Sequence, residues 1–381
     1  MILTTEQRQI QRAARDFAAR EIAPFAQAWD AAGRSPPEIM RALGELGFMG
    51  MCVDPEWGGT GADWLSYVVA VEEIAAGDCG LCNMMCVNNS PNCAALEEHG
   101  TVAQKEAFLR PLAQGLQRSA FLLTEPTAGS DAAAITTRAV RDGETYRING
   151  IKQFVTAGRS ADIALIVAVT DPAAGKRGLA CFLASTTAPG YRVVREESKL
   201  GHRTVDTCQI ALEDLVVPVA NRLGEEGQGY RIALAYLENG RIGVAAQAVG
   251  VARAALEAAL RFANERAAFG KLLIEHQAIN FKLADMATAI ESARQLTWHA
   301  AVLKDAGLPC LKEASMAKLA ASEMAERVCS SALQIHGGYG YVTDFPVEKY
   351  FRDARVLAIY EGTNEIQRLV IGRELSRAAR G

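Results

Sequence analysis

Glu361 is the side chain whose surroundings most strongly suggest chemistry. It follows a short apolar run, residues 356–359, and precedes Gly362 and Thr363. Burial among apolar side chains raises the pKa of a carboxyl group, because it disfavours the charged form. A pKa near neutrality suits a general base. Judged from this segment alone, however, an ion pair with an arginine such as Arg355 is the simpler interpretation.

Two glycine-rich segments could bind a polar ligand. Residues 123–131 interrupt an apolar run with hydroxyl groups and backbone donors, which can hold a polar ring or a pyrophosphate. Residues 334–340 end an apolar helical pattern with several glycines. Composition alone favours simpler roles for both segments, namely a surface turn and a helix stop.

Several other chemistries find no support in the sequence. The glycines at 58–61 and 224–229 lack the strand-to-helix context of a dinucleotide fingerprint, and no phosphate loop occurs. The five histidines show no metal-ligand spacing, so we expect no metal site. Four cysteines are spaced as one helical stripe, which predicts buried packing rather than zinc ligation; they are Cys79, Cys82, Cys86 and Cys93.

Bulk properties are typical of a soluble globular protein with two or three domains. The chain has 381 residues, of which 22% are charged, and its net charge of −4 argues against nucleic-acid binding. No apolar run reaches the roughly 20 residues that cross a bilayer, so we expect no membrane association. The first residues lack a signal-peptide core, and Glu6, Asp16 and Glu21 argue against a transit peptide. We therefore expect a cytoplasmic protein with reduced thiols.

The hydrophobic period changes twice along the chain. It is helical up to about residue 117, strand-like from about 119 to 224, and helical again from about 229 to 375. Within the middle region, residues 146–155 predict two strands joined by a turn at Asn149–Gly150. The order is therefore a helical part, a β part and a long helical part, which must position the polar segments at their edges.

Seven motifs in this order make the chain resemble the acyl-CoA dehydrogenases, especially their short-chain, butyryl-CoA dehydrogenase-like branch. The motifs are Leu123-Thr124-Glu125-Pro126 with Ala128-Gly129-Ser130-Asp131, Asn149-Gly150-x-Lys152, Arg266-x-x-Phe269-Gly270, Gln277, Gln334-x-x-Gly337-Gly338-x-Gly340, Arg352-Asp353-Ala354-Arg355, and Ile359-Tyr360-Glu361-Gly362-Thr363. They span nearly the full length of the chain, so the resemblance is specific.

The resemblance implies a mainly α fold with a β domain. Residues 1–118 would form an N-terminal helical domain, 119–226 a middle β-barrel or sandwich domain, and 227–381 a C-terminal four-helix bundle. FAD would lie between the β domain and the bundle and would cross a subunit boundary. The resemblance therefore also implies a homotetramer.

The resemblance assigns FAD contacts to two groups of residues. One group surrounds the flavin and comprises Leu123, Thr124, Ser130, Phe154, Val155, Thr156, Thr363 and Glu365. The other would bind the adenosine-pyrophosphate half held by a neighbouring subunit and comprises Arg266, Phe269, Gln277, Gln334, Gly337 and Gly338. Phe154 stands where the family often has tryptophan, so the aromatic face is kept without the indole N–H.

The resemblance also implies that Glu361 is the catalytic base. Some family members carry this glutamate on a bundle helix just before an arginine, but Gly240 occupies that slot before Arg241. Gln247 would close the floor of a short acyl pocket, and Leu357 would close its other side. The full set of implied substrate contacts is Ser130, Tyr236, Glu238, Arg241, Gln247, Leu357 and Gly362. For Glu238, a surface position or a contact with the substrate head group is expected.

The implied reaction is the α,β-dehydrogenation of a short or short-branched acyl-CoA to the trans-2-enoyl-CoA. The Glu361 backbone N–H and a flavin ribityl hydroxyl would stabilise the enolate, and the electrons would pass to an electron-transfer flavoprotein. Two alternatives stay open at this stage. One is an acyl-CoA oxidase or an eliminating enzyme on the same scaffold, and the other is a non-catalytic helical binding protein.

Overall fold

The computed structural model describes residues 1–380. Its first part is helical, as the apolar periodicity predicts. The helices are α1 (Thr5–Phe17), α2 (Ala26–Ala32), α3 (Pro37–Glu45), α4 (Trp64–Gly77), α5 (Cys79–Val87), α6 (Ala94–His99), α7 (Val102–Gln104) and α8 (Arg110–Ala113). Thr4 caps α1 in a capping box with Gln7. Because α4 and α5 are apolar on nearly every side, they are buried on nearly every side.

The cysteine stripe belongs to this buried region. Cys79, Cys82 and Cys86 lie on α5, and Cys93 ends the short π-helical segment that follows it. All four thiols are buried and unpaired, and no cluster with metal-ligand geometry occurs within residues 1–380. The prediction of packing cysteines is confirmed, although Ser90 interrupts the helix that would carry all four.

The middle of the chain forms one eight-stranded sheet. Its strands are β1 (Ser119–Leu122), β2 (Arg138–Asp142), β3 (Thr145–Thr156), β4 (Ile163–Val169), β5 (Leu179–Ser185), β6 (Tyr191–Glu196), β7 (Thr207–Pro218) and β8 (Arg222–Leu223). The order is β6-β7-β3-β2-β4-β5-β8, and β1 pairs in parallel with β4. Every residue of β4 is buried, as its continuous apolar run predicts.

The predicted turn at Asn149–Gly150 is wrong. These two residues lie inside the single strand β3, at an irregularity in its pairing with β7. The actual hairpin turn lies at Gly143, between β2 and β3. Gly150 is needed for close packing, because a Cβ there would lie 2.4 Å from the Thr137 hydroxyl oxygen.

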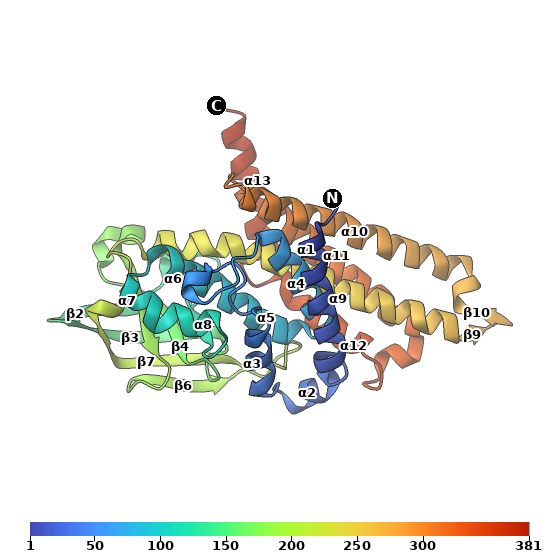
Figure 1. The fold of residues 1–381 in the computed structure, drawn as a ribbon, viewed down its shortest axis with the longest axis horizontal. Helices are drawn as coiled ribbons and strands as arrows, with labels where there is room; N and C mark the ends of the chain where they lie inside the picture. Colours follow the sequence, from blue (N-terminus) through green and yellow to red (C-terminus); the bar gives the residue numbers. More distant parts are fainter. Residues whose placement is uncertain (381) are drawn as a thin grey trace.

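Long helices dominate the rest of the chain. They are α9 (Gly229–Glu265), α10 (Gln277–Asp305), α11 (Leu311–His336), α12 (Val347–Ala354) and α13 (Asn364–Ala378), with the short strands β9 (Ala267–Ala268) and β10 (Lys271–Leu272) between the first two. The sheet and the β9–β10 hairpin lie at opposite ends of the long axis, and α13 projects from the body (Figure 1). By length and composition α9 could cross a membrane, but 89% of its most apolar window is buried, as in a core helix.

Candidate active site

A cavity of about 840 Å³ lies where the sheet loops, α5, α9 and the segment before α13 meet. It brings together residues that are far apart in the sequence, namely Leu123, Thr124, Ser130, Phe154, Thr156, Arg241, Glu361, Gly362 and Thr363. The predicted flavin-side contacts and the predicted base therefore line one space. Val155 is buried outside this lining, and Glu365 is exposed on the first turn of α13.

Glu361 lies in a turn directly before α13. Its φ of 54° is left-handed, which is rare for a side chain larger than that of glycine, and Gly362 follows with a φ of 87°. Oε2 of Glu361 is buried and has no hydrogen-bond partner within residues 1–380. A Cβ on Gly240 would lie 2.7 Å from this oxygen. The missing side chain of Gly240 therefore provides the space that the carboxylate occupies.

The surroundings of Glu361 shift the pKa of its carboxyl group. Burial raises its pKa from 4.5 to about 7, and the cations Arg241 and Lys318 limit the rise. Arg241 is itself buried and donates from Nη1 to the Ser315 hydroxyl over 3.1 Å. Arg355 pairs with Glu326 over 2.7 Å, so it does not form the ion pair with Glu361 that the sequence left open.

The backbone of the Glu361 turn presents a free donor. The Glu361 N–H makes no backbone or side-chain hydrogen bond within residues 1–380. The carbonyl groups, in contrast, are held, because Gln367 Nε2 donates to the oxygens of Glu361 and Gly362 over 3.2 and 2.7 Å. A fixed N–H beside a carboxylate suits a substrate carbonyl that becomes negatively charged.

A buried ion pair holds the loop at residues 123–131 in place. Lys152 Nζ donates to Glu125 Oε1 over 2.9 Å and to the Leu123 carbonyl over 3.0 Å. Burial alone would raise the pKa of Glu125, but Lys152 and hydrogen bonds from Thr136 and Thr137 bring it to about 2. This pair explains why the Asn-Gly-x-Lys motif accompanies the loop: its lysine holds the loop in place.

The predicted substrate contacts fall into two groups. Ser130, Arg241 and Gly362 line the cavity. Tyr236, Glu238, Gln247 and Leu357 do not line it. Tyr236 is buried and donates to Glu98 over 2.8 Å, and Glu238 accepts from the Cys310 thiol. Gln247 is fully buried beneath Tyr360, whose hydroxyl donates to it, and Leu357 is fully buried as well.

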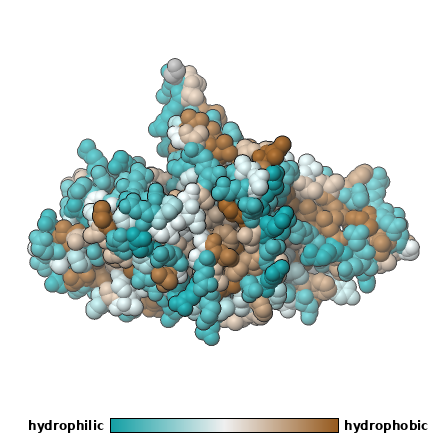
Figure 2. All heavy atoms as spheres, in the orientation of Figure 1, coloured by the Kyte–Doolittle hydropathy of each residue, from teal (hydrophilic) through white to brown (hydrophobic). Residues whose placement is uncertain are grey.

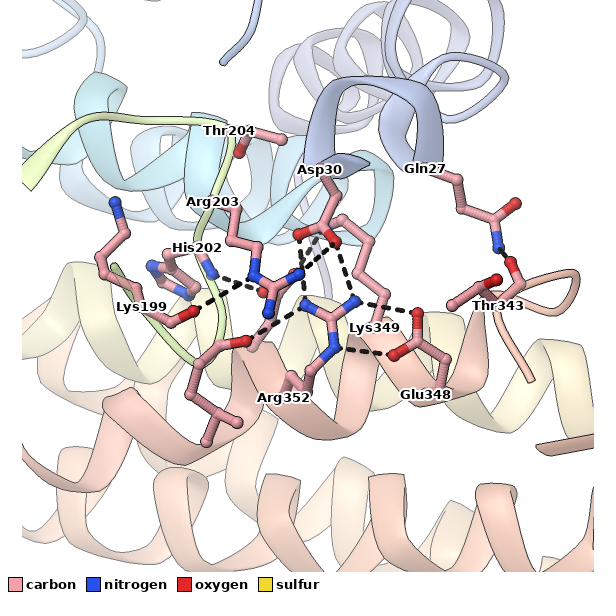
Figure 3. A network of polar contacts seen from close by, with 12 residues as sticks. Gln27, Asp30, Lys199, His202, Arg203, Thr204, Thr343, Glu348, Lys349 and Arg352 are labelled. Carbon is pink, nitrogen blue, oxygen red and sulfur yellow. Dashed lines mark hydrogen bonds and ion pairs between the residues drawn. The ribbon is translucent and has the colours of Figure 1, made fainter. Parts of the chain in front are cut away.

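A polar network at one wall of the cavity joins the three parts of the chain (Figure 3). Arg352 on α12 pairs with Asp30 on α2 over 2.8 Å and with Glu348 over 2.7 Å, and it donates to the Leu200 carbonyl over 3.2 Å. Its neighbour Asp353 accepts from the His202 backbone N–H over 2.6 Å. The Arg-Asp-Ala-Arg motif thus fixes the loop between β6 and β7, which forms one wall of the cavity.

The second predicted FAD group lies at the other end of the molecule (Figure 1). Arg266, Gly337 and Gly338 line a cavity of about 500 Å³, and the Arg266 guanidinium lies 5.6 Å from the Tyr339 ring. A Cβ on Gly337 or Gly338 would meet nothing within 4 Å, so the surface above them is open. Phe269, Gln277 and Gln334 are exposed nearby. One chain does not bring the two groups of FAD contacts together.

Comparison with known proteins gives relatives along almost the whole chain. The short-chain specific acyl-CoA dehydrogenase of Clostridium acetobutylicum is 44% identical over 98% of this chain and 99% of its own. The human mitochondrial short-chain specific acyl-CoA dehydrogenase is 45% identical over 96% of this chain and 89% of its own. Models of the acyl-CoA dehydrogenase N-terminal, middle and C-terminal domains match residues 4–116, 120–215 and 227–376.

The chain belongs to the acyl-CoA dehydrogenase family.

Solved structures agree with this assignment. The butyryl-CoA dehydrogenase of Megasphaera elsdenii has a TM-score of 0.96 at 42% identity and covers 98% of this chain and 99% of its own. A structure described as the electron transferring flavoprotein of Acidaminococcus fermentans has a TM-score of 0.97 at 43% identity, with the same coverage. The predicted fold of a helical domain, a β domain and a helical bundle is confirmed.

As a member of this family, the protein is an FAD-dependent oxidoreductase that acts on acyl-CoA. The residues present fit the cofactor. Phe154 is 65% exposed at the cavity and offers an aromatic face, while Thr124, Ser130 and Thr156 offer hydroxyl groups. The second cavity suits a pyrophosphate for two reasons. The glycines beside Arg266 leave open space, and the arginine presents a planar fork of donors.

Sequence reasoning missed two residues that hold the Glu361 turn. One is Gln367, one turn into α13. The other is Lys318 on α11, whose Nζ donates to the Gly362 carbonyl over 2.9 Å. Lys318 carries a signal in the sequence, because it interrupts the apolar stripe formed by Ala314, Ala321 and Ala325. A lone charge at a core position marks a residue with a specific partner.

Proposed function

We propose that Glu361 is the base that removes the α-proton of a short or short-branched acyl-CoA, in its dehydrogenation to the trans-2-enoyl-CoA. One observation supports the proposal: at the wall of a cavity between the β domain and the bundle, Glu361 has a pKa of about 7 and a buried Oε2 without a hydrogen bond. A base works best when its pKa lies near the working pH.

The residues of the chain divide the work of this step. The Glu361 carboxylate accepts the α-proton of the thioester, which makes its carbonyl oxygen negative. The free Glu361 N–H donates to that oxygen. Arg241 and Lys318 keep part of the carboxylate ionised despite its burial. When bound, FAD supplies the acceptor for the hydride that leaves the β-carbon.

A short acyl chain is supported by the names of the relatives and by the buried residues beside Tyr360. Gln247 accepts from the Tyr360 hydroxyl, so this glutamine fixes a ring that lines the cavity and limits its depth. Leu357 is buried on the same segment.

Electron-transfer flavoprotein is the electron acceptor in this proposal, and the working unit is a cytoplasmic homotetramer. The acceptor is supported by the similarity to the Acidaminococcus fermentans structure. The tetramer is supported by the two FAD half-sites, which form separate cavities in one chain, and by the projecting α13. Hydrophobic residues lie on the surface of α13 and of the bundle end (Figure 2); they include Leu369 and Phe269.

The substrate proposal is tested by titrating the yellow holoenzyme under nitrogen with straight, branched and aromatic acyl-CoAs. Butyryl- or isobutyryl-CoA should bleach the flavin fastest. Gln247→Ala removes the hydrogen bond that holds Tyr360 and should increase the rate of flavin reduction by longer acyl-CoAs. If palmitoyl-CoA outperforms both short substrates in the unmodified enzyme, the short-chain assignment is wrong. Rapid peroxide formation in air without an electron acceptor would identify an oxidase instead.

A further inference from the structure

Lys318 is a fully buried cation in the first half of α11. Burying a charge is unfavourable unless the charged group is well hydrogen-bonded. The partners of this ammonium group are the Gly362 carbonyl at 2.9 Å and the Asn364 side-chain oxygen at 3.0 Å. Among residues 1–380 no carboxylate lies within ion-pair distance of Lys318. Its contacts are therefore directed at the segment that follows Glu361, not at a counter-ion.

The same segment is held from a second side. Ser322, four residues after Lys318 on α11, donates to the Asn364 side-chain oxygen over 3.1 Å, and Gln367 donates to the carbonyl groups of Glu361 and Gly362. A left-handed backbone at a glutamate is strained and persists only where the surroundings enforce it. Lys318 and Gln367 together enforce it here.

The charges around Lys318 connect it to the carboxylate. Burial lowers the pKa of Lys318 to about 7, Glu361 is the strongest influence that opposes this, Arg241 lowers the pKa further, and Glu365 and Glu326 raise it. In the other direction, Lys318 is one of the two cations that lower the pKa of Glu361. The second is Arg241, which reaches the carboxylate from α9. Lys318 thus touches the backbone of the turn and also acts on the charge of its carboxylate.

We propose that Lys318 is a positioning residue for the base: its ammonium group fixes the Glu361–Gly362 turn through the Gly362 carbonyl, and its positive charge favours the ionised form of Glu361. This inference rests on the proposed role of Glu361. Lys318 itself does not line the cavity and so has no direct contact with the substrate.

Two substitutions separate the hydrogen bond from the charge. Lys318→Met keeps the length of the side chain and removes both, whereas Lys318→Gln removes the charge and keeps a donor. Lys312→Met is the matched control, because Lys312 lies on the first turn of the same helix and only near Glu313. Each holoenzyme is mixed anaerobically with butyryl-CoA in a stopped-flow instrument across a range of pH, and its FAD content and melting temperature are measured in parallel.

Lys318→Met should reduce flavin about 10- to 100-fold more slowly at neutral pH, since a misplaced reacting group costs a factor of that size. The rise of the rate with pH should move to higher pH in both variants, and Lys318→Gln should recover part of the rate. Lys312→Met should match wild type. A purely structural lysine would lower the melting temperature and leave the pH profile in place.

Glu361→Gln, measured in the same experiment, separates the positioning role of Lys318 from the role of Glu361 as the base. If Glu361→Gln is inactive while both Lys318 variants keep the wild-type rate and pH profile, the positioning role is wrong and the base assignment stands. If Glu361→Gln still reduces flavin at a near-normal rate, the base assignment itself fails. Should Lys318→Met not fold, the pH profile of Lys318→Gln decides the question by itself.

Discussion

Among single residues, the proposed chemistry depends on one carboxylate in a site of unusual polarity. Glu361 lies against a glycine, has no hydrogen bond to Oε2, and is influenced by two buried cations that form no ion pair with it. Each of these features can be tested by substitution. Burial and the two cations affect the pKa of the carboxylate, and Gly240 affects its position.

The pH dependence of flavin reduction follows from the pKa of Glu361, which burial raises to about 7. A base must be ionised to accept a proton, so the rate should be low in acid and rise as the pH passes through about 7. Stopped-flow reduction by a saturating acyl-CoA under nitrogen measures this. A rate that is flat between pH 5 and 8 would contradict a base with that pKa.

Sequence reasoning found Glu361 but could not describe its surroundings. The motif predicts the residue, and the neighbouring apolar run predicts a raised pKa. The carboxylate's position over Gly240 depends on how α9 packs against the turn before α13, which are more than a hundred residues apart. For the same reason, the sequence grouped Gln247 and Leu357 with pocket-lining residues, whereas both lie fully buried behind the cavity wall.

At the scale of elements, helix α9 and the Glu361 turn fit each other. An alanine at position 240 would place its Cβ 2.7 Å from Oε2 of Glu361, so the carboxylate would have to move. Alanine favours a helix over glycine by about 1 kcal/mol, so α9 itself should stay folded. Gly240→Ala should therefore keep its FAD and melting temperature while flavin reduction falls about 100-fold.

The Gly240→Ala measurement has a clear opposite outcome. A variant that is folded, yellow and within threefold of wild type would mean that the carboxylate does not work from the position described. The control is the double variant Gly240→Ala with Glu361→Gln. Because the carboxylate is already absent in Glu361→Gln, the added methyl group should have little further effect on the rate of flavin reduction.

The elements themselves were predictable where their hydrophobic period is long. The helical, strand-like and second helical regions appear in the structure with nearly the expected bounds. The β3 strand was misread, because an Asn-Gly pair is a strong local signal for a turn. Close approach of Thr137 is a tertiary reason for Gly150, and no local pattern reveals it.

At the scale of the whole molecule, one chain holds two halves of a cofactor site that cannot meet. Arg266 and the open glycines lie at the end of the bundle, while Thr124, Ser130 and Phe154 lie beside the sheet (Figure 1). We propose that an assembly of several chains joins the halves, as the resemblance to the family implies. Light scattering of the FAD-loaded protein should give the mass of a tetramer, and a stable FAD-loaded monomer would contradict this.

Arg266→Ala tests the remote half-site within that assembly. Loss of a charge-assisted hydrogen bond costs about 1.5–3 kcal/mol, so FAD should dissociate about 10- to 100-fold more readily. Arg12→Ala, an exposed arginine on α1 without an ion pair within residues 1–380, is the control and should retain FAD normally. Equal FAD affinity in the two variants, measured by ultrafiltration, would remove Arg266 from the cofactor site.

The most direct test of the whole account is anaerobic flavin reduction by the Glu361→Gln holoenzyme. The amide keeps the size of the side chain but cannot accept the α-proton. The variant should also be more stable than wild type above pH 7, because a carboxyl with a raised pKa loses folded-state stability as the pH rises from 4.5 to about 7. The base assignment predicts a folded, yellow protein that binds acyl-CoA and reduces flavin about 10²–10⁴-fold more slowly. Reduction within a few-fold of wild type, in a protein that is folded and loaded with FAD, would contradict it.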